Sequence, residues 1–323
     1  MSINTLIIGL GRIGMIYDHL KGNNNLIQTH AKAVSLHNDF NLVAGVDPVS
    51  KQRKIFKDKF GKIAFKNLNE VKCDCNIDLV IIATPTNTHL EIIKDTVRLI
   101  KPIMILCEKP LSYKYNDSER IYNICKFSKI KLYVNYMRRC DPGVKIIKEK
   151  IDRHSISTPV KGICWYSNGI YNNGSHFINL LEFWLGEFRE KKVFNKGRFL
   201  NDFEVEPEFI LFFEKGDVIF RNAYEENFSF YKLELLSPSG FLRYDNGGYD
   251  INFQNIKNDR RFLNYKILND KKSEIVSGMN LYQYNVLDEI SKDYVGKNTT
   301  ICKGEEALRT ERIIYLLNND LIN

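Results

Sequence analysis

A glycine-rich loop near the start of the chain has the G-x-G-x-x-G spacing that binds the pyrophosphate of a dinucleotide. It follows a short apolar run and precedes a helical stretch, the context in which this pattern is informative. The first glycine permits a tight turn, the second lets the backbone approach the phosphates, and the third lets helix and strand pack closely. The start of the helix offers unpaired N–H groups to the phosphates. We expect the cofactor to contact Gly9, Gly11, Arg12, Ile13 and Gly14.

The partner of such a loop is an acidic residue after the second strand, and Asp47 has that place. Its carboxylate would bind the adenosine ribose hydroxyls and repel a 2′-phosphate, so NAD is the expected cofactor. Lys51 and Arg53 lie close enough in sequence to leave NADP open. The spacing from the glycine loop exceeds the usual ~20 residues, and an inserted polar segment over residues 17–29 accounts for the excess. The alternative is that Asp47 only shapes the turn before Pro48.

Two further motifs follow the next two apolar runs of the chain. Residues 83–89, Ala-Thr-Pro-Thr-Asn-Thr-His, place small and hydroxyl side chains where a dinucleotide would pass; alternatively, they form a turn with Thr88 as a helix cap. Residues 107–110, Cys-Glu-Lys-Pro, place a lysine where it could orient a substrate oxygen and stabilise alkoxide charge, unless it is a plain surface lysine. From these motifs we expect the cofactor to contact Thr84, Pro85, Asn87, His89, Glu108 and Lys109.

His176 is the candidate general base. It lies in the first turn of an expected helix, in the sequence Asn172-Asn173-Gly174-Ser175-His176. Imidazole accepts a proton near neutral pH, and a helix N-terminus favours its neutral form. Taken alone, such a histidine is more often a capping or packing residue.

Together these motifs resemble the glucose-fructose oxidoreductase / inositol dehydrogenase family (Gfo/Idh/MocA) over nearly the whole chain. The resemblance implies hydride transfer between NAD(P) and a ring carbon of a sugar, a cyclitol or a related compound. It implies that Lys109 and His176 are the catalytic pair. The substrate pocket would be lined by Lys109, Met137, Arg138, Asn172 and His176.

The chain departs from many members of that family at Asn172 and Asn179, where they carry aspartate. An amide cannot take a proton, so either His176 and Lys109 handle the proton between them or the chemistry is altered. Our leading interpretation is an NAD-dependent oxidoreductase acting on a nucleotide sugar in bacterial surface-polysaccharide biosynthesis. One alternative is an inositol or free-sugar dehydrogenase, favoured by the Met-Arg-Arg run at 137–139. Another is a catalytically inactive NAD-binding sensor, which only Asn172 supports.

The elements that must position these residues fall into two groups. Residues 1–121 alternate apolar strands with helices and predict a Rossmann domain with a doubly wound parallel sheet. Residues 122–323 carry strand after strand and predict an α+β domain with a large, mostly antiparallel open sheet, which in the family often serves oligomerisation. The C-terminal helix is free to pack back on the first domain. Strands are expected at 5–8, 42–46, 79–83, 103–107 and 131–135, and then at 160–166, 208–213, 218–224, 231–237 and 241–245.

Composition narrows the function further. The net charge of +8 is spread along the chain without a stripe for nucleic acid. No apolar run reaches the ~20 residues of a membrane helix, and we expect no signal peptide because the N-terminus has the pattern of a strand. Seven scattered cysteines fit a reducing cytoplasm, and Cys73-x-Cys75 lacks further ligands, so no metal is expected. We therefore expect a cytoplasmic homodimer or homotetramer with a small-molecule substrate.

Overall fold

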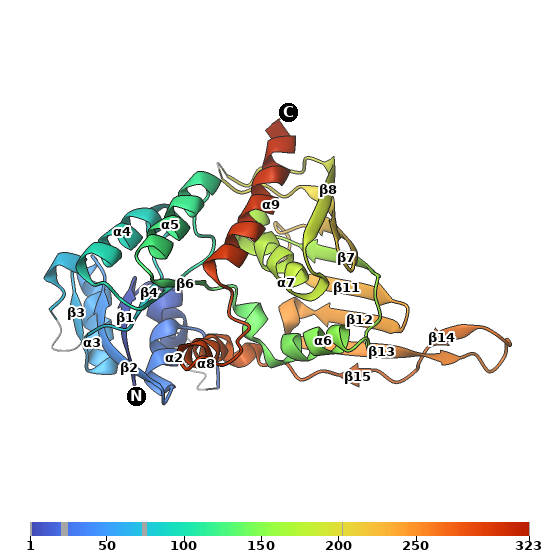
Figure 1. Ribbon diagram of the computed structural model, residues 1–323, viewed down its shortest axis with the longest axis horizontal. Helices are drawn as coiled ribbons and strands as arrows, with labels where there is room; N and C mark the ends of the chain where they lie inside the picture. Colours follow the sequence, from blue (N-terminus) through green and yellow to red (C-terminus); the bar gives the residue numbers. More distant parts are fainter. Residues whose placement is uncertain (1, 21–24, 73–75, 202, 323) are drawn as a thin grey trace. The chain divides into compact units, whose positions relative to one another are not determined.

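The computed structural model describes residues 2–20, 25–72, 76–201 and 203–322 (Figure 1). The chain folds into two compact units, each built from two stretches of sequence. The first unit comprises residues 1–140 and 280–311, and the second comprises residues 141–279 and 312–323. The boundary expected at residue 121 falls inside helix α5 (Tyr115–Phe127), within the first unit. The division of function at that residue stays a prediction.

The first unit contains a six-stranded parallel sheet with the order β3-β2-β1-β4-β5-β6. The order reverses between β1 and β4, which is the switch point where doubly wound sheets bind their ligands. The predicted Rossmann architecture is confirmed. The strand β3 was not predicted because it has only three residues, which is shorter than the apolar runs that predicted the other strands. The strands are β1 (Ile3–Ile8), β2 (Phe40–Val46), β3 (Ile63–Phe65), β4 (Leu79–Ile82), β5 (Met104–Cys107) and β6 (Lys131–Val134).

Both faces of this sheet are covered. Neighbouring residues of a strand point to opposite faces, and both sets of side chains are buried. Ile7 belongs to a core cluster that includes residues of α2 and α8, whereas Leu6 belongs to a cluster that includes residues of α4 and α5. The chain therefore returns from the second unit, and α8 closes one face of the first sheet. The helices of this unit are α1 (Tyr17–Leu20), α2 (His30–Leu36), α3 (Ser50–Phe60), α4 (His89–Leu99), α5 and α8 (Tyr282–Tyr294), and α9 (Gly304–Ile322) begins in it.

Two helix caps differ from what the sequence suggested. Thr88 precedes α4 without capping it, because its hydroxyl donates instead to the carbonyl oxygen of Pro85 at 2.7 Å. Asparagine is a common N-cap residue, so the sequence also suggests Asn116 as the cap of the next helix, but α5 begins at Tyr115 and Asn116 lies inside it. By contrast, Asp141 caps α6 (Pro142–Asp152) by accepting hydrogen bonds from the N–H groups of the next turn.

The second unit contains a large, mostly antiparallel sheet, in which β7–β10 is the one parallel pair among the described strands. This confirms the predicted second fold class. One face packs against helices: the Trp184 ring of α7 (Ser175–Leu185) lies 5.9 Å from that of Tyr244. The other face carries exposed apolar side chains, including Ile163 and Leu236. The strands are β7 (Val160–Tyr166), β8 (Phe188–Asn195), β9 (Glu208–Phe213), β10 (Gly216–Asn222), β11 (Lys232–Ser237), β12 (Gly240–Asp245), β13 (Asp250–Asn258), β14 (Lys266–Leu268) and β15 (Ser273–Glu274).

Candidate functional site

The three glycines of the loop after β1 have three different reasons to be glycine. Gly9 has a φ of +94°, and a Cβ atom there would lie 2.5 Å from the carbonyl oxygen of Ala83. A Cβ atom on Gly14 would lie 2.0 Å from the carbonyl oxygen of Gly9, so this position permits the close return of the chain. Gly11 has ordinary extended backbone, and a Cβ atom there would meet nothing within 4 Å. The folded protein itself therefore does not require glycine at position 11, and the open space is where a ligand can approach the backbone.

Asp47 is buried at the end of β2 and shapes the loops beside it. Its Oδ2 accepts a hydrogen bond from the Leu10 N–H at 2.8 Å, and its Oδ1 accepts one from the Val49 N–H at 2.8 Å. The turn role weighed for this residue is thus present, and it also ties the glycine loop to β2. Its contact with ribose hydroxyls stays a prediction. Nη1 of Arg53 donates to the carbonyl oxygens of Asp47 and Pro48, both at 2.8 Å.

A cavity of about 510 Å³ opens at the carboxyl ends of β1, β2 and β4. Five of the predicted cofactor residues line it, namely Gly9, Gly11, Asp47, Thr84 and Pro85. The segment that follows β3 also lines it through Lys66, Asn67, Leu68 and Asn69, which sequence reasoning missed because β3 itself was missed. The position at the switch point, the open glycine and the carboxylate fit one half of a dinucleotide.

His89 joins the loops that follow β4 and β5. It is fully buried, its Nε2 lies 3.0 Å from the carbonyl oxygen of Thr84, and its Nδ1 lies 3.1 Å from those of Pro110 and Leu111. Burial lowers the pKa of His89, although the carbonyl acceptors and the charge of Glu108 act in the opposite direction. The ring therefore faces the interior and connects the two loops that carry the predicted cofactor residues.

A second buried group holds the loop that carries Lys109. Oε1 of Glu311, on α9, accepts a hydrogen bond from the Leu111 N–H at 2.6 Å, two residues after the half-buried Lys109. Oε2 of Glu311 is buried and has no partner among the described residues. Burial raises the pKa of Glu311 to about 7, against the hydrogen bonds from Ser118 and Leu111. Sequence reasoning missed this residue because 200 positions separate it from the loop that it holds.

Glu108 lies directly before Lys109 and is held by two buried side chains. Nε2 of His30 and Nδ2 of Asn135 each lie 2.7 Å from its Oε1. Burial alone would raise the pKa of Glu108, but the hydrogen bonds from His30 and Asn135 and the Lys109 charge hold it below its usual value. This site residue is therefore an anion.

His176 and its neighbours belong to the second unit. A one-turn π-helix at Ile170–Gly174 leads into α7, and His176 is buried in the first turn of α7. The helical spacing of the apolar residues in 177–184 predicts one apolar face with His176 away from it, but His176, Ser175 and Asn179 are buried together with the apolar residues. Asn172 is half-buried. Lys109 and His176 belong to different compact units, and their catalytic pairing stays a prediction.

The Met-Arg-Arg run forms a short 3-10 turn after β6 in the first unit. Met137 packs against the core cluster that includes α8 residues, and Arg138 is buried. Arg139 is also buried and donates through Nη2 to Oε1 of Glu306 at 2.7 Å, which fixes the start of α9. Arg139 therefore has a structural task, whereas the substrate roles of Met137 and Arg138 stay predictions. The other predicted cofactor residues outside the cavity lining are Arg12, Ile13, Gly14 and Asn87, of which Arg12 and Asn87 are exposed.

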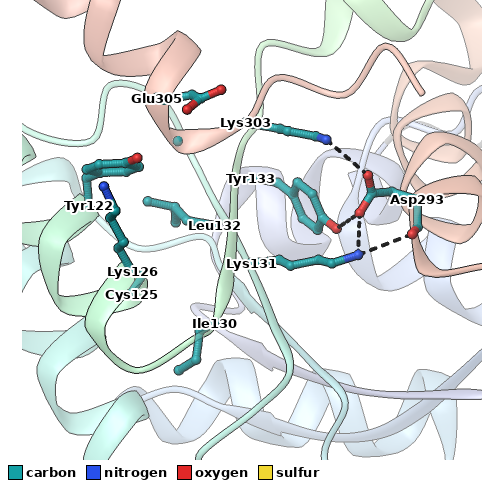
Figure 2. A pocket seen from close by; sticks show the side chains of 11 residues that line it. Tyr122, Cys125, Lys126, Ile130, Lys131, Leu132, Tyr133, Asp293, Lys303 and Glu305 are labelled. Carbon is teal, nitrogen blue, oxygen red and sulfur yellow. Dashed lines mark hydrogen bonds and ion pairs between the residues drawn. The ribbon is translucent and has the colours of Figure 1, made fainter. Parts of the chain in front are cut away.

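A second cavity, of about 300 Å³, lies beside the edge strand β6 (Figure 2). Asp293 of α8 lies on one side of it, where Lys131 and the Tyr133 hydroxyl donate to its Oδ2, both at 2.7 Å, and Lys303 lies 3.3 Å from its Oδ1. This cluster joins α8 and the start of α9 to the edge strand. None of the predicted site residues lines this cavity.

Within the described residues, no group of three or more His, Cys, Asp or Glu side chains could hold a metal ion, and Cys73 and Cys75 lie outside those residues. None of the helices described by the structure combines the length and apolar character needed to cross a bilayer.

Comparisons with known proteins agree with this geometry. Residues 3–136 match the GFO_IDH_MocA family, described as an oxidoreductase family with an NAD-binding Rossmann fold. The chain is 31% identical over 154 residues to a myo-inositol 2-dehydrogenase of Thermotoga maritima, covering 47% of this chain and 42% of that protein. It is 29% identical over 204 residues to an inositol 2-dehydrogenase of Rhizobium meliloti, covering 58% of this chain and 56% of that protein. These matches span about half the length of the curated relatives.

Some solved structures are similar to this chain over its whole length. The WlbA dehydrogenase of Bordetella pertussis, in complex with NADH and UDP-GlcNAcA, superposes with a TM-score of 0.72 at 14% identity over all of this chain and 97% of that one. At this identity the likeness shows the fold of both units. The motifs and the switch-point cavity agree with the family match, so residues 3–136 are similar to oxidoreductases with an NAD-binding Rossmann fold.

Proposed function

We propose that this chain is an NAD-dependent oxidoreductase that transfers hydride to or from a ring carbon of a nucleotide-linked sugar in bacterial surface-polysaccharide biosynthesis. The observation that carries the proposal is the open Gly11 beside a cavity at the switch point of a Rossmann sheet. The family match to an oxidoreductase with an NAD-binding Rossmann fold supports it.

The loop around Gly11 would hold the pyrophosphate, and Asp47 would accept hydrogen bonds from the adenosine ribose. Each carboxylate oxygen of Asp47 uses one lone pair on a backbone N–H, and the other remains for a ribose hydroxyl. A 2′-phosphate would lie against this anion, which favours NAD over NADP. Arg53 could offset that charge only partly, because Nη1 of its guanidinium is held by backbone carbonyls.

The chemistry proposed is oxidation of a C–OH group to a ketone, or its reverse. When bound, NAD supplies the nicotinamide carbon that accepts the hydride. His176 takes the hydroxyl proton at an imidazole nitrogen, and the Lys109 ammonium group donates a hydrogen bond to the substrate oxygen as negative charge develops there. Asn172 binds a substrate hydroxyl but cannot accept a proton, which leaves the proton transfer to the imidazole.

Two substrate classes compete, and each has support. The net charge of +8 favours an anionic nucleotide sugar, and a structure of the same fold binds UDP-GlcNAcA. The relatives named inositol 2-dehydrogenases favour a free cyclitol instead. The Met-Arg-Arg run supports the cyclitol less than the sequence suggested, because Arg139 is held by Glu306.

We also propose that the exposed face of the second sheet joins copies of the chain into a homodimer or homotetramer. Ile163 and Leu236 are exposed there, and Ile163 pairs in register with Ile219 of β10. Light scattering would then report an oligomer for the wild type and a smaller species for Ile163→Asp. We also propose that the protein is cytoplasmic, because its seven cysteines are scattered without the spacing of a disulfide framework.

The test is a screen of nucleotide sugars and free polyols for an absorbance change at the nicotinamide band. We expect turnover with a nucleotide sugar and a loss of at least ~100-fold in Lys109→Ala, with NADH binding retained. If only myo-inositol is turned over, the substrate is a cyclitol and not a nucleotide sugar. NADH binding without any turnover would support the sensor, and full activity of Lys109→Ala would remove Lys109 from the mechanism.

A further inference from the structure

A network of buried polar side chains in the first unit includes Glu108, the residue before Lys109. It joins His30 of α2, Glu108 after β5, Asn135 after β6 and Gln283 of α8. Nδ2 of Asn135 donates both to Oε1 of Glu108 at 2.7 Å and to Oε1 of Gln283 at 3.2 Å. His30 and Asn135 thus meet at the Glu108 carboxylate, and Gln283 joins the network through Asn135.

The chemistry of the groups settles the direction of these hydrogen bonds. An ionised carboxylate only accepts, so Nε2 of His30 carries the proton that it shares with Oε1 of Glu108. Because Asn135 also donates to Oε1, one oxygen takes both protein donors. No described residue donates to Oε2, and the Glu108 side chain is 15% exposed, whereas His30 is 1% exposed.

We propose that His30 is a positioning residue for the cofactor site. With Asn135, it fixes Glu108 through Oε1, so that Oε2 stays available to accept a hydrogen bond from a sugar hydroxyl of the bound dinucleotide. The same contact sets the loop from which Lys109 projects. This inference rests on the proposed function, because it concerns the binding of NAD.

The same helix provides a matched control at its other end. His37, the residue after α2, is also buried and lies with its Nε2 3.1 Å from Oδ1 of Asp288. Asp288 is 47% exposed and lies in α8, outside the predicted cofactor residues. His37 therefore has a comparable structural role without a contact to the site.

The experiment measures the NADH dissociation constant by fluorescence, together with the melting temperature, in His30→Leu, His30→Gln and His37→Leu. Losing a charged hydrogen bond should weaken NADH binding about tenfold or more in His30→Leu. His30→Gln places an amide N–H near the position of Nε2 and should bind within about threefold of the wild type. His37→Leu should melt earlier but bind NADH like the wild type.

If His30→Leu fails to fold, His30→Asn replaces it in the experiment. The asparagine amide is too short to reach Glu108, so the same weakening of NADH binding is expected. The inference is overturned if the variant without the donor binds NADH like the wild type, or if His37→Leu weakens binding equally. Failure of the proposed function looks different, because the wild type itself would then either not bind NADH or bind it without turning over any sugar.

Discussion

The two units hold their site residues by different means. In the first unit, the loops after β4 and β5 are short and are clamped by buried polar side chains, namely His89, Glu311 and the His30–Glu108 pair. In the second unit, His176 belongs to a helix that is buried on most sides and rests on apolar packing, with Trp184 and Phe177 both against Tyr244. Polar clamps respond to pH and to the loss of single atoms, whereas packing responds to volume.

The largest effect on stability should come from the second unit, where apolar packing holds the helix that carries His176. Trp184 is fully buried, and its Nε1 donates to the carbonyl oxygen of Val144 at 3.1 Å. Trp184→Ala should lower the free energy of unfolding by about 3–5 kcal/mol, through lost burial and a cavity. Urea unfolding followed by circular dichroism should give the same loss at pH 5 and at pH 8. A loss that changes strongly with pH would contradict the role of packing.

In the first unit, the free energy of unfolding should instead depend on pH through Glu311. Burial raises its pKa in the folded protein to about 7 from an ordinary 4.5, so between these values the folded state holds a proton that the unfolded chain has lost. Stability should therefore fall as pH rises through this window, by roughly 3 kcal/mol in total. Glu311→Gln keeps an acceptor for Leu111 and removes the titration, so it should match the wild type near pH 5 and exceed it at pH 8.

Glu289 is the control for that measurement. It is equally buried, but the Lys292 ammonium group and the Thr300 N–H both donate to it at 2.7 Å. Glu289→Gln should therefore lower the melting temperature at pH 8. If Glu311→Gln also lowers it at pH 8, the unpaired Oε2 does not destabilise the charged form, and the clamp is not sensitive to pH.

A smaller effect sharpens the comparison, because the second unit also contains polar clamps, such as Glu204, which accepts from the Tyr171 N–H, and Asp141. Asp141 caps α6 and also accepts from the Gly278 N–H at 2.6 Å, so it joins the two ends of a long stretch of chain. Asp141→Ala should cost about 1–3 kcal/mol in urea unfolding. A cost near that of Trp184→Ala would show that the second unit also depends mainly on polar clamps.

What the sequence could predict follows the same division. The parallel strands of the first unit other than β3 were predicted because they are short apolar runs with mostly buried residues. Strands β7 and β9 were predicted from the same apolar signal in the second unit. β8 and β13 were missed because most of their residues are polar. The glycine loop and Asp47 were found from local spacing, whereas His30, Asn135 and Glu311 were not. Their contacts join positions from 27 to 200 residues apart, which only the fold brings together.

The most direct test of the account is calorimetric titration of NAD⁺ into the wild type and Gly11→Val. Position 11 has extended backbone and open space, so valine should leave the melting temperature unchanged while blocking the approach of the pyrophosphate. We predict that the wild type binds one NAD⁺ per chain and that Gly11→Val binds at least about tenfold more weakly. Equal binding by the two proteins, or no binding by the wild type, would contradict it.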